Sequence, residues 1–492
     1  MKMGQHSDKT FFDASSRPRA AASLIAVAAV IAITLVSVLC AAGKYREAAA
    51  AGFVTLAVGY ILSANVSIES ILIFWFATTP LASFYVRFPL DKSIITYNRA
   101  VIFLAVAVLV LKSYKAARID RLISDFSLTK FEIAWTMLSL ASLASALIRS
   151  NDAGYAMKLA VDTFFLPVVA FHLARHHFDA RSRKSALLIG AIALALFLFA
   201  TGAYEFATGT NLFQYKGSAL VREGERRVNG PFASDSSYAI ISLLLALFLQ
   251  ALPGIMGARL SKMTRLAYSC AIAAVVLASL LPLFRATAIA LIVCLIILKI
   301  AARKSVMPVS ASALSSWLVV IMITLIFAGV SLGYFSSGRR LTDPRNAFGR
   351  LATWEAAAGI AIENPLFGVG LANYQDYFRG KYNWEDESVE QVMDTRAANS
   401  PHSNLFWVAA ELGALAFALY VAANLQLFLM GWRALKRAAA PAERTAAACY
   451  LALFAAYWIH GLTLASGYYS DLNLYFFFML GLLSNKSMVS DS

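Results

Sequence analysis

The side chain best suited to acid–base chemistry is His402, which stands where a long polar stretch ends and an apolar stretch begins. It follows Pro401 and precedes Ser403 and Asn404, residue types that commonly cap helices. We therefore expect a helix to begin beside it. A neutral imidazole at a helix N-terminus suits a proton acceptor, so His402 is the candidate general base.

The other histidines have simpler explanations. Three of them lie beside Arg175 at a predicted helix end, where basic residues are typical of membrane topology. Another ends an apolar run in the sequence YWIHGL, as expected of a residue in an aromatic belt at a membrane interface. These histidines are His6, His172, His176, His177 and His460.

Arginines in three separate places supply the second candidate chemistry. Arg227, Arg285 and a group that includes Arg345 and Arg350 could converge on one anion after the helices pack. Guanidinium groups bind phosphate and diphosphate well, and they can stabilise a diphosphate leaving group without a metal. The alternative interpretation is binding to lipid headgroups, or pairing with the acidic run at residues 385–394. That run lacks the spacing of a metal cage and is typical of a solvated loop.

The elements that position these residues are predicted to be membrane helices. Of 492 residues, 60% are hydrophobic and only 14% are charged, which is too apolar for a soluble domain. Apolar runs of about 20 residues, enough to cross a bilayer as a helix, recur along the chain, and the pattern of a membrane β-barrel is absent. The net charge of +15 comes from basic residues scattered through short loops, which indicates no nucleic-acid partner. We expect an all-α polytopic membrane protein.

The hydropathy pattern predicts about 14 transmembrane helices. We place them at residues 21–42, 47–64, 66–86, 98–112, 131–148, 157–174, 185–203, 234–253, 264–281, 284–301, 313–334, 404–430, 443–461 and 470–485. With a cytoplasmic N-terminus, this order puts the basic loop clusters on the cytoplasmic side. The predicted organisation is a cytoplasmic segment at 1–20, a helix bundle at 21–334, a large periplasmic loop at 335–403, C-terminal transmembrane helices at 404–486 and a cytoplasmic tail at 487–492.

Two polar loops, at residues 204–234 and 335–403, fall on the periplasmic face in this topology. Both carry arginines, although the positive-inside rule predicts few basic residues on this side. The presence of these arginines therefore needs a functional explanation. A short turn at residues 281–284 brings Arg285 to the same face. The candidate base and the candidate anion-binding arginines are thus expected on one side of the membrane.

Within the larger loop we expect an amphipathic helix on the membrane surface. Asn346 can cap it, and it should stop at Asn364, because the residue before a proline disfavours helix. Gly368 and Gly370 then allow a tight turn where the backbone can approach a ligand or a neighbouring helix. The predicted apolar face consists of Phe348, Leu351, Trp354, Ala358 and Ile362.

Two stretches, GRLATWEAAAGIAIENPLFGVG and PHSNLFWVAAELG, resemble the signature of the bacterial O-antigen ligase and Wzy-type O-antigen polymerase family. The matching residues are Arg350, Trp354, the turn from Pro365 to Gly370, His402 with Ser403, Glu411 and Gly413. The segments RVNGPFASDSSYA, with Arg227, and LPLFRATAIA, with Arg285, resemble the family as well. The resemblance covers the C-terminal half closely and the N-terminal half only as a scaffold of membrane helices.

The resemblance implies a membrane glycosyltransferase with a GT-C-like fold in the bacterial inner membrane. It would transfer a glycan from undecaprenyl diphosphate to a sugar hydroxyl at the periplasmic face, with inversion and without a metal or other cofactor. His402 would activate the acceptor, and Arg227 and Arg285 would hold the diphosphate. The implied substrate-binding residues are Arg345, Arg350, Trp354, Gly368, Gly370 and Glu411. The expected partners are the lipid-linked glycan donor, a glycan or lipid A-core acceptor, and inner-membrane lipids.

Several functions stay open at this point. A ligase would pass the glycan to a lipid A-core sugar and a polymerase to another lipid-linked repeat unit; the number of spans slightly favours a polymerase. A transporter or flippase of a lipid-linked or polar solute is the alternative from another class, with Asp162 as the main candidate for a charge inside a span. The absence of a P-loop and of a dinucleotide fingerprint argues against nucleotide-driven transport. A structural or sensory protein would leave the outward arginines unexplained.

Overall fold

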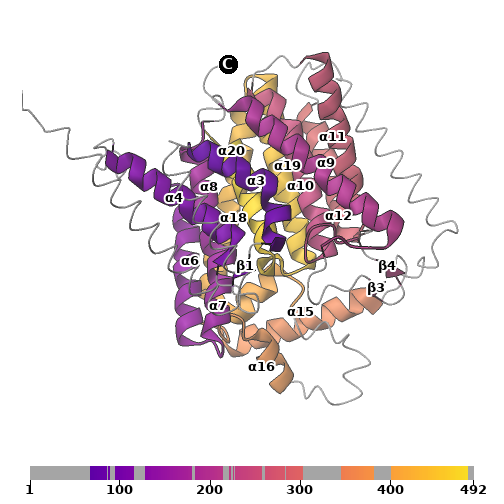
Figure 1. The fold of residues 1–492 in the computed structure, drawn as a ribbon. Helices are drawn as coiled ribbons and strands as arrows, with labels where there is room; N and C mark the ends of the chain where they lie inside the picture. Colours follow the sequence, from indigo (N-terminus) through magenta and orange to yellow (C-terminus); the bar gives the residue numbers. More distant parts are fainter. Residues whose placement is uncertain are drawn as a thin grey trace, which may run out of the picture. The chain divides into compact units, whose positions relative to one another are not determined.

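The computed structural model describes residues 67–85, 87–88, 95–115, 128–179, 183–213, 221–222, 225–226, 228–256, 261–282, 284–302, 345–381 and 400–485. The chain divides into two compact units, and the helices below belong to the unit formed by Ile68–Arg87 and Thr96–Ser492. Figure 1 shows this unit as an assembly of helices.

Eight helical segments of the described residues are long and apolar enough to cross a membrane. The elements at the predicted spans are α3 (Ile68–Tyr85), α4 (Tyr97–Lys115), α6 (Lys130–Ile148), the run α7 (Ala153–Ala160), η1 (Val161–Phe165) and α8 (Leu166–His176), then α9 (Lys184–Thr208), α10 (Asp235–Met256), α11 (Lys262–Leu280), α12 (Arg285–Ala302), α18 (Asn404–Arg437), α19 (Pro441–Thr463) and α20 (Ser470–Leu483). The prediction of a polytopic helical membrane protein is confirmed. The predicted spans 21–42, 47–64 and 313–334 lie outside the described residues, so the total of 14 and the GT-C-like arrangement stay predictions.

Two short strand pairs accompany the helices in the part of the chain that the structure describes. They are β1 (Arg87–Phe88) with β2 (Ile95–Thr96), and β3 (Val221–Arg222) with β4 (Glu225–Arg226). The second pair is antiparallel, with Val221 opposite Arg226. It falls within the loop that was predicted at residues 204–234, and α9 continues into that loop as far as Thr208.

Helix α20 lies at the centre of the packing. It is apolar on every side, and all residues from Leu472 to Leu483 are buried, as expected of a helix surrounded by other helices. It contacts α8, α10 and α19. Aromatic side chains fill the contact with α3: the rings of Trp75 and Tyr475 stack at 5.7 Å, and the Tyr475 hydroxyl donates to the Phe76 carbonyl at 2.8 Å. This rigid centre positions the helices whose ends carry the polar residues.

An ion pair within the bundle involves Asp162, the charge that the sequence placed inside a span. Its two carboxylate oxygens accept from Nε and Nη2 of Arg99 at 2.7 and 2.6 Å. Asp162 lies in the π-helical turn η1, which forms just before Pro167, where an α-helix would lose the hydrogen bond to the Thr163 carbonyl. The bidentate pair with Arg99 accounts for this half-buried carboxylate as part of the framework.

Helix α18 is broken at Gly413, which has φ 77° and ψ −177°. The predicted span 404–430 is therefore two helical pieces in sequence, and the second piece continues to Arg437. The hydropathy pattern could not reveal this, because both pieces are apolar and the break contains a single glycine. The break matters for the site, since the chain on both sides of it contacts the turn after α15.

Helices α15 (Arg345–Glu363) and α16 (Tyr374–Lys381) lie at the end of the bundle where α7 begins, at the bottom of Figure 1. The helix predicted from Asn346 to Asn364 is confirmed within one residue at each end. Of its predicted apolar face, Leu351 and Ile362 are 54% and 77% exposed. Trp354 of this face stacks on Phe406 of α18, and residues outside the predicted face complete the contact: Ala356, Ala357 and Ile360 pack with Tyr374, Phe378 and Ala410.

Candidate active site

His402 precedes the N-terminus of α18, as predicted, with Ser403 at the N-cap position and Asn404 as the first helical residue. Its φ of 49° lies in the left-handed region, which disfavours a residue with a side chain by about 1–2 kcal/mol. Its backbone N–H donates to Ser400 Oγ at 3.3 Å. The surrounding structure must therefore hold this conformation.

Asn404 supplies much of that support. Its amide nitrogen donates to Ser466 Oγ at 2.5 Å, and its side-chain oxygen accepts from the backbone N–H of Gly467 at 3.4 Å. Both partners belong to the short 3-10 helix η4 (Ser466–Tyr468) between α19 and α20. A Cβ at Gly467 would lie 2.1 Å from the Trp407 ring, so this turn can approach α18 only with glycine at that position.

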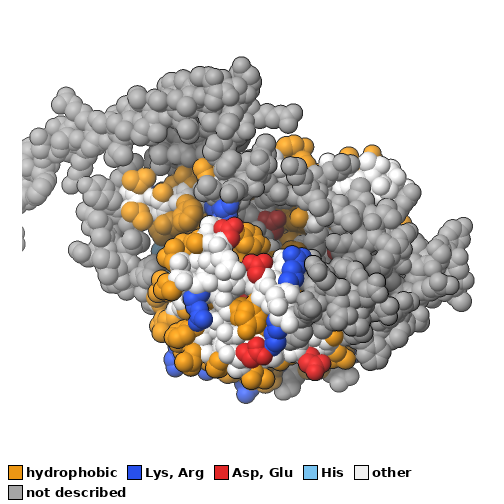
Figure 2. All heavy atoms as spheres, turned by 90° about the horizontal axis from the view of Figure 1, so that it is seen from below, with side chains coloured by type: hydrophobic (Ala, Val, Ile, Leu, Met, Phe, Trp, Pro, Cys, Tyr) orange, Lys and Arg blue, Asp and Glu red, His pale blue; other side chains and the backbone are white. Residues whose placement is uncertain are grey.

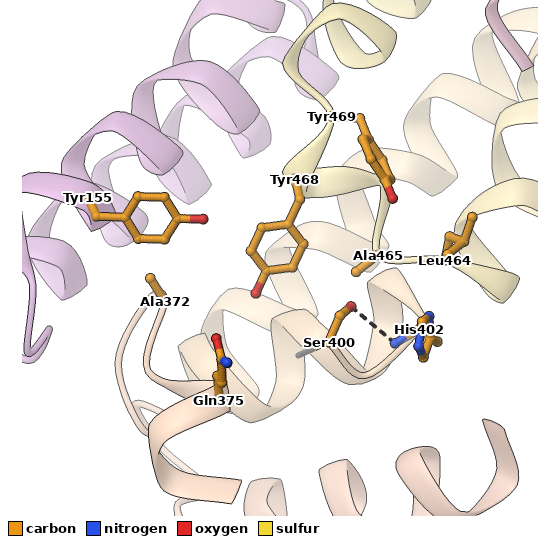
Figure 3. A pocket seen from close by; sticks show the side chains of 9 residues that line it. All are labelled: Tyr155, Ala372, Gln375, Ser400, His402, Leu464, Ala465, Tyr468 and Tyr469. Atoms are coloured by element: carbon orange, nitrogen blue, oxygen red, sulfur yellow. Dashed lines mark hydrogen bonds between the residues drawn. The ribbon is translucent and has the colours of Figure 1, made fainter. Parts of the chain in front are cut away.

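A cavity of about 240 Å³ adjoins His402. Figure 3 shows Tyr155 from α7 pointing toward Tyr468, with Gln375 from α16 directed into the space near them. The residues that line the cavity are Tyr155, Ala372, Gln375, Ser400, His402, Leu464, Ala465, Tyr468 and Tyr469. Burial, and the nearby carboxylate of Glu411, raise the pKa of Tyr468 well above its usual value, so its hydroxyl keeps its proton. The cavity thus combines flat aromatic faces with hydroxyl and amide groups beside an imidazole.

Glu411 lies beneath the wall of this cavity and accepts four hydrogen bonds. Oε2 accepts from the backbone N–H of Ala372 and from Trp407 Nε1, both at 2.8 Å. Oε1 accepts from the backbone N–H of Tyr374 at 3.2 Å and from the Tyr468 hydroxyl at 3.3 Å. A carboxylate has enough acceptor sites for all four donors. Glu411 therefore ties together α18, the segment before α16, and the turn that carries Tyr468.

The turn at residues 365–370 lies alongside the break in α18. Three backbone hydrogen bonds join them: Val369 N–H to the Ala410 carbonyl (2.9 Å), Gly370 N–H to the Glu411 carbonyl (2.9 Å), and Ala414 N–H to the Pro365 carbonyl (2.7 Å). Because the helix is interrupted, the carbonyls of residues 410 and 411 accept bonds from outside it. The turn and the broken helix thus form one structural element.

The glycines of this element are required by close backbone contact. A Cβ at Gly368 would lie 2.3 Å from the carbonyl carbon of Glu411, and a Cβ at Gly413 would lie 2.5 Å from that of Leu366. Both glycines have positive φ, 64° and 77°, which other residues adopt only with strain. Gly370, at φ 102°, approaches the Arg149 carbonyl in the same way, with a Cβ distance of 2.8 Å.

The positive charges of Arg285 and Arg350 act on each other at this end of the bundle. Burial lowers the pKa of Arg350, and the nearby positive charge of Arg285 lowers it further. His460, buried at the end of α19, lies 5.7 Å from the Phe284 ring and within reach of the Arg350 charge. One turn beyond His460 is Leu464, a lining residue of the cavity. Within the part of the chain that the structure describes, neither arginine forms an ion pair.

Trp354 connects the arginine helix to the helix of His402. Trp354 lies one turn beyond Arg350 on α15, and Phe406 lies in the first turn of α18. The two rings stack with 5.7 Å between centroids and 23° between planes. The side chain of Arg345, the first residue of α15, and the whole of Arg227 lie outside the described residues, so their predicted roles stay predictions. Figure 2, which views this end, shows basic and acidic side chains interspersed with apolar ones.

The segment that follows Arg227 is held by Glu205, near the end of α9. The carboxylate accepts from the backbone N–H groups of Asn229 and Gly230 at 3.0 and 2.7 Å, and from the Asn211 side chain at 3.0 Å. A Cβ at Gly230 would overlap the Tyr238 ring. The glycine and the buried carboxylate fix the course of the chain directly after Arg227.

Some residues at this end were not found from the sequence. His460 was interpreted as interfacial, and the lining residues Tyr155, Gln375, Tyr468 and Tyr469 were not considered. Their only signal is polarity beside predicted outer helix ends, which many residues share. Among the described residues, the group of metal-ligating side chains that converges is Glu132 with His172 and His176, at the opposite end of α6 and α8.

Comparison with known proteins gives an independent view of the chain. No curated protein matches it. Residues 269–421 match the family model described as O-antigen ligase, a segment that contains Arg285, Arg350, His402 and Glu411. The resemblance seen in the sequence is confirmed for residues 269–421, which are similar to the O-antigen ligase family.

Proposed function

We propose that the protein is a membrane glycosyltransferase that moves a glycan from undecaprenyl diphosphate to a sugar hydroxyl, as an O-antigen ligase or as a polymerase of O-antigen or exopolysaccharide. The reaction would take place at the periplasmic face of the inner membrane. The family match and the apolar helices support this class of enzyme. The observation that carries the proposal is the place of His402 in the wall of a cavity, at the end of the bundle where the positive charges of Arg285 and Arg350 act on each other.

Two cations in a partly buried position repel each other. An anion placed between them would remove this repulsion, and guanidinium groups bind a diphosphate better than most anions. We assign the diphosphate of the donor to Arg285 and Arg350, and we expect Arg227 to join them. His460 would lie at the edge of this anion site.

In the proposed step, the acceptor hydroxyl oxygen forms a bond to the anomeric carbon while the bond from that carbon to the diphosphate oxygen breaks. The electron pair leaves with the diphosphate, whose added charge the arginines stabilise. The proton of the hydroxyl passes to the imidazole of His402. Direct displacement inverts the anomeric carbon, and no cofactor is required.

The acceptor sugar is assigned to the His402 cavity. Its volume of about 240 Å³ is smaller than the roughly 300–1,000 Å³ of drug-sized sites, so it would take one sugar ring and leave the rest of the glycan outside. The rings of Tyr155 and Tyr468 offer flat apolar faces, and Gln375 offers both a donor and an acceptor. His402 lines the same cavity and would face the reacting hydroxyl.

The test uses His402→Ala, Arg285→Ala and Arg350→Ala in cells that lack the unchanged protein, with protein level controlled. Surface glycan should be lost. Transfer by the purified enzyme should fall by about 10²–10⁴ for the histidine and about 10²–10³ for each arginine. The controls, His177→Ala and Arg265→Ala, change the same residue types at the other end of the bundle. Normal glycan from His402→Ala would remove the assignment of the base.

Lipid-linked intermediates distinguish the two products. A strain without the protein should accumulate single lipid-linked repeats if it is a polymerase, and long lipid-linked polymer if it is a ligase. A transporter would instead move the lipid-linked glycan in vesicles without joining it to an acceptor. Covalent joining by purified protein in detergent, where no compartments exist, would exclude transport as its primary activity.

A further inference from the structure

Three potential metal ligands converge between α6 and α8, away from the candidate active site. Glu132 Oε1 is hydrogen-bonded to His172 Nδ1 at 2.8 Å and lies 3.6 Å from His176 Nε2. The three ligand atoms all lie within 4.8 Å of one another. His172 and His176 are four residues apart on α8, so their imidazoles project from the same face of the helix.

The carboxylate of this group is held in place by a contact at its other oxygen. Glu132 Oε2 accepts from the backbone N–H of Thr129 at 2.7 Å, and the Thr129 hydroxyl accepts from the Glu132 N–H at 3.2 Å. This capping box at the start of α6 leaves Oε1 directed at the two imidazoles. An outer contact that fixes a ligating carboxylate is a common property of metal sites.

Burial also favours a bound ion at this position. The Glu132 side chain is fully buried, and the side chains of His172 and His176 are only 10% and 16% exposed. Nε2 of His176 is buried and makes no hydrogen bond within the described residues. Its distance of 3.6 Å from Glu132 is too long for a hydrogen bond, whereas ligands about 2.0–2.2 Å from a common tetrahedral centre are separated by roughly this amount.

We propose that Glu132, His172 and His176 bind a divalent transition-metal ion of the Zn²⁺ type. Two imidazoles and one carboxylate form a donor set that zinc accepts, with a fourth position left for water. Mg²⁺ and Ca²⁺ depend on several carboxylate oxygens, whereas this site offers a single carboxylate, whose negative charge already interacts with the positive charge of Arg175. The site should therefore reject these two ions. Imidazole ligation gives the selectivity for the softer ion.

The site would stabilise the packing of α6 against α8. It is remote from the cavity, because Tyr155 and His176 lie on one helical run and are separated by about 30 Å at 1.5 Å per residue. The proposed ion therefore takes no part in glycosyl transfer. It would join two helices that both contact the central part of the bundle.

The experiment uses the full chain without a polyhistidine tag, purified in detergent, treated with a chelator and dialysed. Titration with ZnCl₂ is followed by calorimetry and by thermal unfolding. We expect saturable binding of one ion per chain and a higher unfolding midpoint. His176→Gln should weaken binding by at least about tenfold, since loss of even an outer contact commonly has that effect. His177→Gln, the neighbouring histidine, should bind zinc like the unchanged protein.

Two further measurements make the result decisive. Cobalt added in place of zinc should give the visible absorption of a tetrahedral centre in the unchanged protein and in His177→Gln, but not in His176→Gln. Millimolar Mg²⁺ should not compete. Equal zinc binding by His176→Gln and the unchanged protein, or no saturable binding at all, would overturn the proposal. Glycosyl transfer is not a readout, so this outcome is separate from that of the proposed function.

Discussion

Replacement of Glu411 by glutamine tests whether this carboxylate holds the cavity wall. Glutamine has nearly the same shape but keeps only one acceptor oxygen, and its amide nitrogen is a donor. The best orientation leaves the oxygen with the two 2.8 Å contacts, from Ala372 and Trp407. The amide NH₂ then faces the Tyr374 N–H and the Tyr468 hydroxyl. The hydroxyl can rotate to accept, but the backbone N–H cannot.

The expected loss of stability follows from these contacts. One buried N–H that loses its acceptor costs about 1–3 kcal/mol, and the remaining bonds lose the added strength of a charged acceptor, about 1 kcal/mol. We therefore expect Glu411→Gln to lower the free energy of unfolding by about 2–4 kcal/mol. Because Tyr468 lines the cavity, the KM for the acceptor should rise as well, while the KM for the lipid-linked donor should change little.

Thermal unfolding in detergent and steady-state kinetics with varied acceptor provide the measurement. The matched control is Glu363→Gln, the same substitution at an exposed position of α15 whose carboxylate contacts Lys381; it should unfold like the unchanged protein. If Glu411→Gln had the same unfolding midpoint and acceptor KM as this control, the assignment of Glu411 as a support of the cavity would be refuted.

Three further predictions concern the framework and the cavity. Gly368→Ala should destabilise the protein by about 1–3 kcal/mol because of its left-handed φ and the contact with α18. Its control is Gly380→Ala in α16, where a Cβ would meet open space, and this change should be neutral or stabilising by up to about 1 kcal/mol. Thermal unfolding of the two variants measures the difference. Asp162→Asn should cost about 3 kcal/mol, since the buried Arg99 would lose its partner, and a variant that unfolds normally would contradict a structural role. Tyr468→Phe should raise the acceptor KM and lower stability by about 1 kcal/mol, which kinetics and unfolding measure together.

The sequence predicted the elements that depend on local pattern. Apolar runs gave the positions of α6 and α9–α12 within a few residues, because burial in lipid requires continuous apolar helices. The C-terminal limit of α15 followed from the proline after Asn364, which acts on its immediate neighbour. The predicted cap at Asn346 was wrong, because the helix already includes Arg345. His402 was correctly placed before the first turn of a helix, because cap-forming residue types also act on their immediate neighbours.

Contacts between distant segments could not be predicted in this way. The backbone bonds between the turn at residues 365–370 and the break at Gly413 join segments about 45 residues apart, and only their three-dimensional arrangement explains the glycines. The place of His460 near the Arg350 charge depends on how α18 packs against both α15 and α19. Glu411 was expected to bind substrate by family resemblance, and its four donors become visible only when α18, η4 and the segment before α16 are assembled.

The break at Gly413 also determines how α18 fits the thickness of a membrane. A straight helix of its 34 residues would measure about 51 Å at 1.5 Å per residue, well beyond a hydrocarbon layer of about 30 Å. The piece after Gly413, roughly 36 Å long, is sufficient to cross that layer alone. In the proposed topology the shorter first piece would lie at the level of the lipid headgroups. His402 would then stand at the depth expected for the diphosphate of a polyprenyl donor whose tail remains among the acyl chains.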